Sequence, residues 1–308
     1  MSKLLAVGTL AYDAIETPFD RTEKTLGGSV SYIALAASHF NVEFGIVSVI
    51  GGDFEEKHLD LLRSKNINLD GVEQIPDGKT FFWSGKYHND MNSRDTLLTE
   101  LNTLADFNPK VPDHFKDAEV LLLGNLHPSI QMSVLDQMEK RPNLVILDTM
   151  NYWMEHTPNQ LDAVLERIDV LAINDEEARL LSGEYSLVKA AKKILTKGPK
   201  YLVIKKGEHG ALLFHEDHVF FAPALPLEEV YDPTGAGDTF AGGLSAYLAE
   251  SRHISFDRLK SALIHGANLA SFCVEELGTG RMENLTRDEI ASRLEVFRTL
   301  TQCVIELD

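Results

Sequence analysis

The residues best suited to chemistry lie in the stretch Asp232-Pro-Thr-Gly-Ala-Gly-Asp238, which opens an apolar run with helical spacing. Gly235 and Gly237 allow the backbone to turn N–H groups toward one point, and the positive end of the following helix adds to them. Such a concavity holds the charge that develops on a transferring phosphoryl group. Asp238 can accept a proton from an attacking hydroxyl. The stretch favours a phosphoryl-transfer site, with simple helix capping by Asp238 as the alternative.

Two other motif matches fail on their spacing. Gly78-Lys79-Thr80 resembles the end of a P-loop, but Glu73 stands where the first glycine of that motif is required. Gly235-Ala236-Gly237 begins like a dinucleotide fingerprint, but Phe240 occupies the position of the third glycine. The second failure speaks against an NAD-dependent reductase.

The composition of the chain limits the classes of protein to which it can belong. The chain has 308 residues, of which 44% are apolar and 25% charged, and its formal net charge is −18. This acidic balance argues against a nucleic-acid partner and against binding to an anionic membrane surface. Two cysteines, Cys273 and Cys303, form no disulfide framework, and the N-terminal residues are typical of a buried strand rather than a signal peptide. We therefore expect a cytoplasmic protein.

Short apolar runs alternate with amphipathic stretches along most of the chain. Near-continuous apolar runs separated by helical patterns are typical of parallel strands that are buried on both faces. The sequence therefore predicts an α/β fold with a doubly wound, mainly parallel sheet and helices on both of its faces. The runs are LLAVG (4–8), FGIVSVI (44–50), VLLLG (120–124), LVILD (144–148), VLAIN (170–174) and YLVIK (201–205).

Two segments break this alternation, about 14–26 and 72–103. They carry turn residues and little helical periodicity, which indicates a small antiparallel sheet inserted in a single domain of residues 1–308. Such an insertion commonly acts as a lid over a site. Phe82, Trp83 and Tyr87 fall within it, and alternation turns Phe82 and Trp83 to opposite faces, so that only one set can meet a substrate.

Six stretches of the chain form an ordered set of motifs: VGTLAYD (7–13), LGGSVSYIALAA (26–37), VIGGDF (49–54), INDEEARLLSG (173–183), VIKKGEHGA (203–211) and DPTGAGDTF (232–240). Together they resemble the motifs of the ribokinase-like (PfkB) carbohydrate kinases. That family phosphorylates a sugar or nucleoside hydroxyl with ATP, on a doubly wound α/β domain with a small β-sheet lid. The resemblance covers nearly the whole chain and implies the same fold and activity here.

The resemblance implies a role for each matched residue. The catalytic set has Asp238 as the general base and an anion hole of backbone N–H groups, and Mg²⁺ is placed through water near the N-x-x-E motif. In some members a monovalent cation binds near the position of Asp232, so K⁺ is a further expected ligand. The anion hole comprises Gly235, Ala236 and Gly237; substrate binding falls to Asp13, Gly27, Gly28, Asp148 and Asn151; nucleotide binding to Asn174, Lys205, Gly207, Gly210 and Asn268; and Mg²⁺ to Glu177.

Several of these residues also have a purely structural interpretation. Asn174 is suited to capping the helix that begins at DEEARLL, which is compatible with a role at the nucleotide. Asn268 stands among small helical residues and could simply ease helix packing, while Asp13 could begin a turn.

Three departures from the family pattern limit what can be said of the substrate. Tyr32 replaces an asparagine expected near the sugar, with Ser31 the nearest polar substitute. Lys205 replaces the threonine that usually precedes the nucleotide turn. The stretch LDTMNYW (147–153) stands where many members carry Asp/Asn-Pro-Asn.

We therefore expect an ATP- and Mg²⁺-dependent kinase that acts on a hydroxyl of a small sugar or polyol. A nucleoside is the alternative acceptor, since lid aromatic residues could stack a base. A non-catalytic ligand sensor is a remoter alternative, which would have lost the base or the glycines. Exposed aromatic residues in the lid would also make a homodimer reasonable.

Overall fold

The structure is a computed structural model, and it describes residues 1–251 and 253–302. A sheet of nine strands forms its centre, in the order β13-β12-β11-β10-β9-β8-β1-β4-β5. The strands from β11 to β5 in this order are all parallel to their neighbours, and β12 and β13 add an antiparallel edge. The strands are β1 (Ser2–Val7), β4 (Val42–Gly51), β5 (Asn68–Ile75), β8 (Val120–Leu123), β9 (Leu144–Asp148), β10 (Val170–Asn174), β11 (Tyr201–Lys205), β12 (Ala211–His215) and β13 (His218–Ala222).

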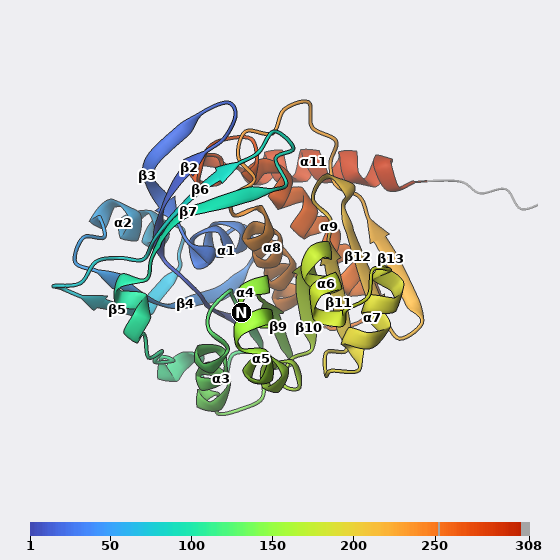
Figure 1. Cartoon of the computed structure of the whole chain (residues 1–308), viewed down its shortest axis with the longest axis horizontal. Helices are drawn as coiled ribbons and strands as arrows, with labels where there is room; N and C mark the ends of the chain where they lie inside the picture. Colours follow the sequence, from blue (N-terminus) through green and yellow to red (C-terminus); the bar gives the residue numbers. More distant parts are fainter. Residues whose placement is uncertain (252, 303–308) are drawn as a thin grey trace, which may run out of the picture.

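Helices cover both faces of this sheet (Figure 1). In β1, Leu4 and Ala6 join one apolar cluster with α1, α2, α8 and α9, whereas Leu5 and Val7 join a second cluster with α3, α5, α6 and α7. This alternation explains the near-continuous apolar runs, because each face of a central strand is buried. The helices are α1 (Ser29–Ala37), α2 (Glu56–Ser64), α3 (Pro128–Gln137), α4 (Asn151–His156), α5 (Pro158–Leu165), α6 (Asp175–Ser182), α7 (Leu187–Leu195), α8 (Ala236–Ser251), α9 (Phe256–Cys273), α10 (Gly280–Asn284) and α11 (Arg287–Thr301).

A second sheet of four strands, in the order β3-β2-β6-β7, lies in the upper part of the view in Figure 1. It consists of two antiparallel hairpins whose first strands pair in parallel. The sequence predicts a small antiparallel sheet from these two segments but not the parallel contact between β2 and β6, which depends on how the two hairpins meet in space. The strands are β2 (Ala11–Glu16), β3 (Arg21–Gly27), β6 (Phe82–Tyr87) and β7 (Arg94–Glu100).

The predicted fold class, a mainly parallel doubly wound sheet with a small additional sheet, is confirmed. One boundary differs. Residues 72–75, expected in the small sheet, belong to β5 and pair with β4 at the edge of the large sheet. An edge strand is only half covered, so it lacks the continuous apolar run that marks the central strands. Among the described residues, no helix combines the length and the apolar character that a bilayer span needs.

Candidate active site

Asp238 lies in the first turn of α8, directly after a glycine turn. Gly235 has a φ of +73°, in the left-handed region that favours glycine. In the part of the chain that the structure describes, the N–H groups of Gly235 and Gly237 are bonded to no acceptor, as is usual at the start of a helix. The Ala236 N–H, expected as a third donor of the anion hole, instead donates to the Pro233 carbonyl at 3.2 Å.

Asp238 is an unusually basic carboxylate. Burial raises the pKa of Asp238 to about 7, and the nearby carboxylate of Asp148 adds to the rise. The positive charges of Lys205 and Arg94 act in the opposite direction. A group whose pKa lies near the working pH is suited to proton transfer. The surroundings of Asp238 thus differ from those of an ordinary helix cap at a protein surface.

Three neighbouring strands of the large sheet end in polar residues at one edge: Asp148 on β9, Asn174 on β10 and Lys205 on β11. Lys205 Nζ lies 2.7 Å from Asp148 Oδ1. A Cβ atom at Gly237 would lie 3.2 Å from the same Nζ, so the lysine reaches the glycine turn. This is the carboxyl edge of the parallel strands, where α/β proteins bind ligands.

The N-x-x-E motif forms a capping box at the start of α6. Glu177 N–H donates to Asn174 Oδ1 at 2.8 Å, and Asn174 N–H donates to Glu177 Oε2 at 2.8 Å. Burial raises the pKa of Glu177 to about 7, although the charge of Lys205 opposes the rise. The predicted capping role of Asn174 is confirmed, and the motif at the same time brings a half-buried carboxylate beside Lys205.

Asp13 lies on β2, in the four-stranded sheet, against the glycine pair. A Cβ atom at Gly27 would lie 2.1 Å from Asp13 Oδ2, which shows how closely the carboxylate meets the backbone there. Burial raises the pKa of Asp13 to about 7, and the charges of Asp232 and Asp238 add to it, while a hydrogen bond from the Gly28 backbone opposes it. The predicted substrate residues Asp13, Gly27 and Gly28 are therefore adjacent. The negative charge of Asp238 contributes to the raised pKa of Asp13.

The register of β2 against β6 separates the lid aromatic residues. Trp83 pairs directly with Asp13, and Phe82 pairs with Tyr12. Side chains of paired residues project to the same face of a sheet. Trp83 therefore shares the face of Asp13, whereas Phe82 lies on the face of the buried Tyr12 and packs against the core.

The tips of the four-stranded sheet contact the nucleotide-side loop and the glycine turn. Gly207 has a φ of +55°, and a Cβ atom there would lie 2.5 Å from Asn92 Oδ1, in the loop between β6 and β7. Thr234 Oγ1 donates to Tyr87 Oη at 3.2 Å. Gly210, at the other end of the loop, packs against β13. The small sheet is thus in contact with both parts of the site.

Two predicted residues have mainly structural contacts. Asn268 is fully buried, and its Nδ2 donates to the Ile290 carbonyl at 3.1 Å, which joins α9 to α11. Asn151 is exposed at the start of α4, and its Oδ1 accepts from the N–H of Tyr152 at 2.9 Å. Their contacts with adenine and with substrate remain predictions.

Asp232 is fully buried in the loop before the glycine turn. Its two carboxylate oxygens accept from the N–H groups of Thr234, at 2.8 Å, and Gly278, at 2.7 Å. Burial nevertheless raises the pKa of Asp232. The residue holds the loop that carries the motif.

Arg94 is a member of the site that the sequence did not suggest. It lies on β7, with its guanidinium carbon 5.8 Å from the Trp83 ring centroid and 6.0 Å from that of Tyr87. Its charge opposes the raised pKa values of Asp238 and Glu177. The pairing of Arg94 with Tyr87 could have indicated it, but that register becomes visible only in the folded sheet.

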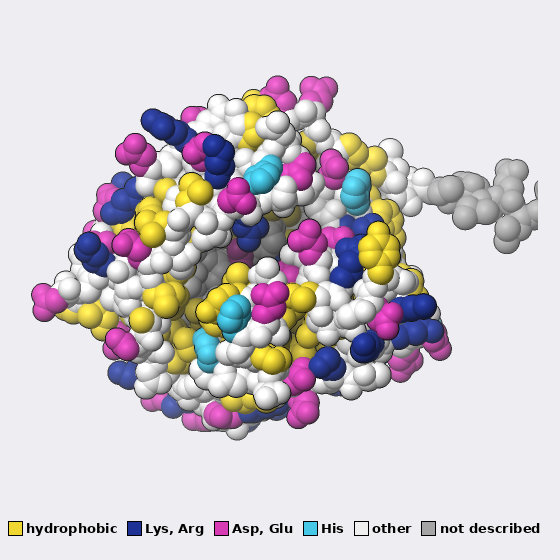
Figure 2. All heavy atoms as spheres, in the orientation of Figure 1, with side chains coloured by type: hydrophobic (Ala, Val, Ile, Leu, Met, Phe, Trp, Pro, Cys, Tyr) yellow, Lys and Arg dark blue, Asp and Glu magenta, His cyan; other side chains and the backbone are white. Residues whose placement is uncertain are grey.

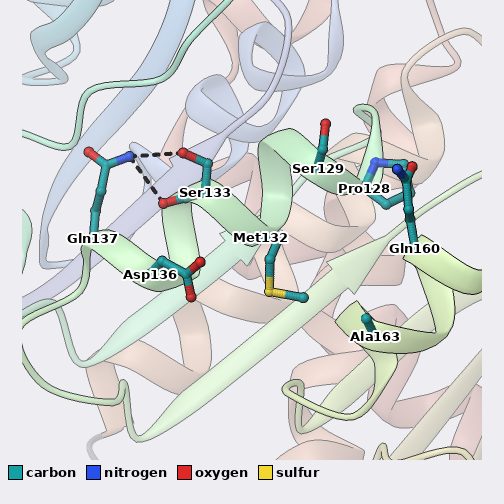
Figure 3. A pocket seen from close by; sticks show the side chains of 8 residues that line it. All are labelled: Pro128, Ser129, Met132, Ser133, Asp136, Gln137, Gln160 and Ala163. Carbon is teal, nitrogen blue, oxygen red and sulfur yellow. Dashed lines mark hydrogen bonds between the residues drawn. The ribbon is translucent and has the colours of Figure 1, made fainter.

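Figure 2 shows the surface hollowed between the four-stranded sheet and the helices below it. Basic and acidic side chains are both visible inside the hollow. A separate surface cavity of about 460 Å³ lies between α3 and α5 (Figure 3). It includes none of the predicted site residues, and Gln137, at one end of it, is already bonded to Ser133.

Comparisons with known proteins agree with this geometry. The family model for pfkB family carbohydrate kinases matches residues 1–286. A cytidine kinase of Thermococcus kodakarensis is 30% identical, over 82% of this chain and 90% of the relative. A nucleoside kinase of Methanothermobacter thermautotrophicus is 27% identical, over 90% of both chains.

Among solved structures, the nucleoside kinase of Methanocaldococcus jannaschii superposes with a TM-score of 0.77 at 22% identity. The match covers 96% of this chain and 99% of that one. This likeness shows the fold, and the family model shows the family. The chain belongs to the PfkB family of carbohydrate kinases, and it is an ATP-binding phosphotransferase with an alcohol group as acceptor.

Proposed function

We propose that the protein transfers the terminal phosphoryl group of ATP to a hydroxyl of a nucleoside. The observation that carries this proposal is the pairing of Asp13 with Trp83 on one face of the four-stranded sheet. A carboxylate can bind sugar hydroxyls, while an indole ring beside it can stack a base. The two relatives named above, a cytidine kinase and a nucleoside kinase, support this choice of acceptor.

In this proposal Asp238 removes the proton of the attacking hydroxyl, and the free N–H groups of Gly235 and Gly237 bind the transferring phosphoryl group. Both N–H groups lack a partner among the described residues, and Asp238 has a pKa of about 7. Asp13, with Gly27 and Gly28, holds the sugar hydroxyls. Ala236 contributes through the turn rather than through its N–H, which the Pro233 carbonyl already accepts.

ATP lies on the side of Asn174, Lys205, Gly207 and Gly210, with Mg²⁺ bound through water to Glu177. Glu177 provides a half-buried oxygen ligand of the type that Mg²⁺ prefers. Within residues 1–251 and 253–302, no cluster of three or more potential metal ligands is present, so the phosphates would supply much of the coordination. Bound Mg²⁺ would neutralise phosphate charge. Asn268 would face the adenine only through its buried Oδ1.

A monovalent cation such as K⁺ near Asp232 would offset the burial that raises the pKa of this carboxylate. Turnover in KCl would then exceed turnover in NaCl or choline chloride at equal ionic strength. Equal rates in the three salts would remove K⁺ from the proposal.

The chain would form a single catalytic domain, and the four-stranded sheet would act as a lid over its site. Its contacts at Gly207 and Thr234 support this role, because they join the small sheet to both parts of the site. One of its two edge strands, β7, exposes Leu97 and Leu98, with 57% and 48% of each residue accessible, and an unpaired edge strand readily pairs with a second copy. We therefore propose a homodimer through the lid, which light scattering of the wild type and of L98D would test.

We propose a cytoplasmic location, which the use of ATP and the free thiol of Cys273 support. The net charge of −18 argues against a nucleic-acid partner. Cell fractionation and a salt-dependent binding assay with DNA would test these two statements.

The deciding experiment is a coupled ADP-release screen over nucleosides, sugars and polyols. We expect turnover with at least one nucleoside, and W83A should raise the KM for that nucleoside by about tenfold or more, the equivalent of ~1.4 kcal/mol of lost stacking. The KM for ATP should not change. F82A is the matched control, because Phe82 lies on the other face of the same strand.

A small sugar or polyol is the second candidate acceptor, in keeping with the carbohydrate kinases that give the family its name. Turnover with a free sugar or polyol but with no nucleoside, together with an unchanged KM in W83A, would favour it.

A further inference from the structure

Lys205 and Asp148 form a mostly enclosed ion pair that spans three strands. Their side chains are 19% and 12% exposed, and Nζ lies 2.7 Å from Oδ1. Lys205 pairs with Asn174 on β10, and Asp148 pairs with Ala172 on the other side of the same strand. Since neighbouring strands are about 4.8 Å apart, the lysine must extend across the end of β10 to reach its partner.

This extension brings the ammonium group to the glycine turn. A Cβ atom at Gly237 would lie 3.2 Å from Lys205 Nζ, and among the described residues no other atom outside the local helix backbone and the adjoining residues comes within 4 Å of that position. The free N–H of Gly237 and the lysine are therefore side by side. The ammonium group is also close enough to Asp238 for its positive charge to lower the pKa of that carboxylate.

Lys205 also has unused hydrogen-bonding capacity. An ammonium group has three N–H donors. Among the described residues, Asp148 is its one hydrogen-bond acceptor. Two donors remain in a region that also holds the carboxylates of Asp148, Glu177 and Asp238, whose negative charge would repel a phosphoryl group.

We propose that Lys205 is a further catalytic residue, which binds the phosphoryl group in transfer, and that Asp148 is a positioning residue that holds Lys205 there. This inference rests on the proposed kinase function. In the step, the acceptor oxygen forms a bond to the γ-phosphorus, and the bond from that phosphorus to the β,γ-bridging oxygen breaks. Its electron pair leaves with ADP, and the hydroxyl proton passes to Asp238. Lys205 stays protonated throughout.

The role assigned to Asp148 differs from the substrate contact expected from the sequence, because its Oδ1 is used by Lys205. The proposal also assigns a function to Lys205, which stands where the family usually has a threonine. A charged donor supplies more stabilisation to a phosphoryl group than a hydroxyl does.

The test compares K205M, K205R and D148N with wild type in turnover and in nucleotide binding by calorimetry. We expect K205M to lower kcat by about 100-fold to 1,000-fold, the usual effect of removing one group that stabilises transition-state charge. Its KM for the acceptor should stay within about twofold. AMP-PNP should bind at least about tenfold more weakly and ADP unchanged, because the lysine contacts only the terminal group. K205R should restore part of the turnover, and D148N should lower kcat by about tenfold with ADP binding unchanged.

K200M is the matched control. Lys200, which immediately precedes β11, pairs with Asp169 at 3.2 Å at the opposite edge of the sheet, so the same substitution there should leave turnover and both affinities unchanged. If K205M unfolds because it leaves Asp148 unpaired, the double variant K205M/D148N removes both charges and takes its place.

Turnover of K205M within about threefold of wild type, or an equal loss of AMP-PNP and ADP binding, would overturn the inference. The comparison of AMP-PNP with ADP needs no acceptor. It therefore still decides the position of Lys205 if the wild type phosphorylates no alcohol in the screen, the result that would instead count against the proposed function.

Discussion

Tyr32 packs its ring directly against Gly235, so that a Cβ atom at the glycine would lie 2.4 Å from ring carbons of the tyrosine. The residue that replaces the expected asparagine is therefore fully buried behind the glycine turn. Its ring supports the glycine turn by packing against Gly235, and it offers no amide to a substrate as the expected asparagine would.

This contact predicts that alanine lowers the stability of the protein at Gly235 but not at Gly237. G235A introduces both a clash with Tyr32 and a side chain at a φ of +73°, so it should destabilise the protein by about 2 kcal/mol or more. In G237A the new methyl group would meet only the flexible end of Lys205, at 3.2 Å. Its unfolding temperature should therefore be close to that of wild type, while its kcat should be lower. Thermal unfolding and kcat of both variants check this, and equal stability of the two would contradict it.

Removing the Tyr32 hydroxyl should stabilise the protein. The hydroxyl is buried and has no hydrogen-bond partner among the described residues. Such a group costs about 1 kcal/mol or more. Y32F should therefore raise the midpoint of urea unfolding with an unchanged m-value and leave kcat within about twofold. A lower midpoint would show that the hydroxyl has a partner in solution.

Activity should rise with pH and level off above neutrality. Asp13 and Asp238 have pKa values of about 7 because both are buried near other carboxylates. Asp238 must be ionised to accept a proton, and Asp13 must be ionised to accept two hydrogen bonds from hydroxyls. We expect log kcat/KM to increase through pH 6–7 with a slope greater than one, since two groups titrate together. D13N should reduce this slope, and a flat profile from pH 5.5 to 8 would rule out this assignment.

The same ionisations predict that stability falls as pH rises. In the unfolded chain an aspartate has a pKa of about 3.9, so between there and pH 7 the folded protein binds more protons at Asp238 than the unfolded one. The stabilisation is complete at low pH and is lost as pH rises through about 7. D238N keeps a neutral side chain throughout, so its Tm at pH 8 should exceed that of wild type by a few degrees, at about 2–4 °C per kcal/mol.

The same variant separates function from stability. Its kcat should fall by about 1,000-fold, the usual scale for a general base, while ATP binding remains measurable by calorimetry. Near-native turnover of D238N would mean that another group takes the proton.

Much of the fold could be predicted because central parallel strands are buried on both faces. The runs that end at Asp148, Asn174 and Lys205 predicted three strands of a mainly parallel sheet, and the structure places these strands side by side, so that their carboxyl ends meet at one edge. The pairing of β5 with the large sheet was missed because an edge strand carries exposed polar residues. The parallel contact between β2 and β6 depends on tertiary packing, which leaves no local signal.

The site was predicted as a set of residues but not as a set of contacts. The motif spacing indicated Asp238 and the glycine turn, yet not that the Pro233 carbonyl takes the Ala236 N–H. Lys205 was noted as a departure, but its bond to Asp148 joins positions far apart in the chain. The position of Arg94 in the site depends on the register between β6 and β7, which cannot be read from the composition of the chain.

The residue proposed to hold the alcohol, Asp13, and the residue proposed to take its proton, Asp238, come from separate parts of the molecule: a strand of the small sheet and a helix on the large one. If the small sheet opens and closes as the proposed lid, water that enters the open site would meet the base without the carboxylate that positions the acceptor. This division of the site between two sheets would then limit hydrolysis of ATP, and each turnover would require one closure of the lid.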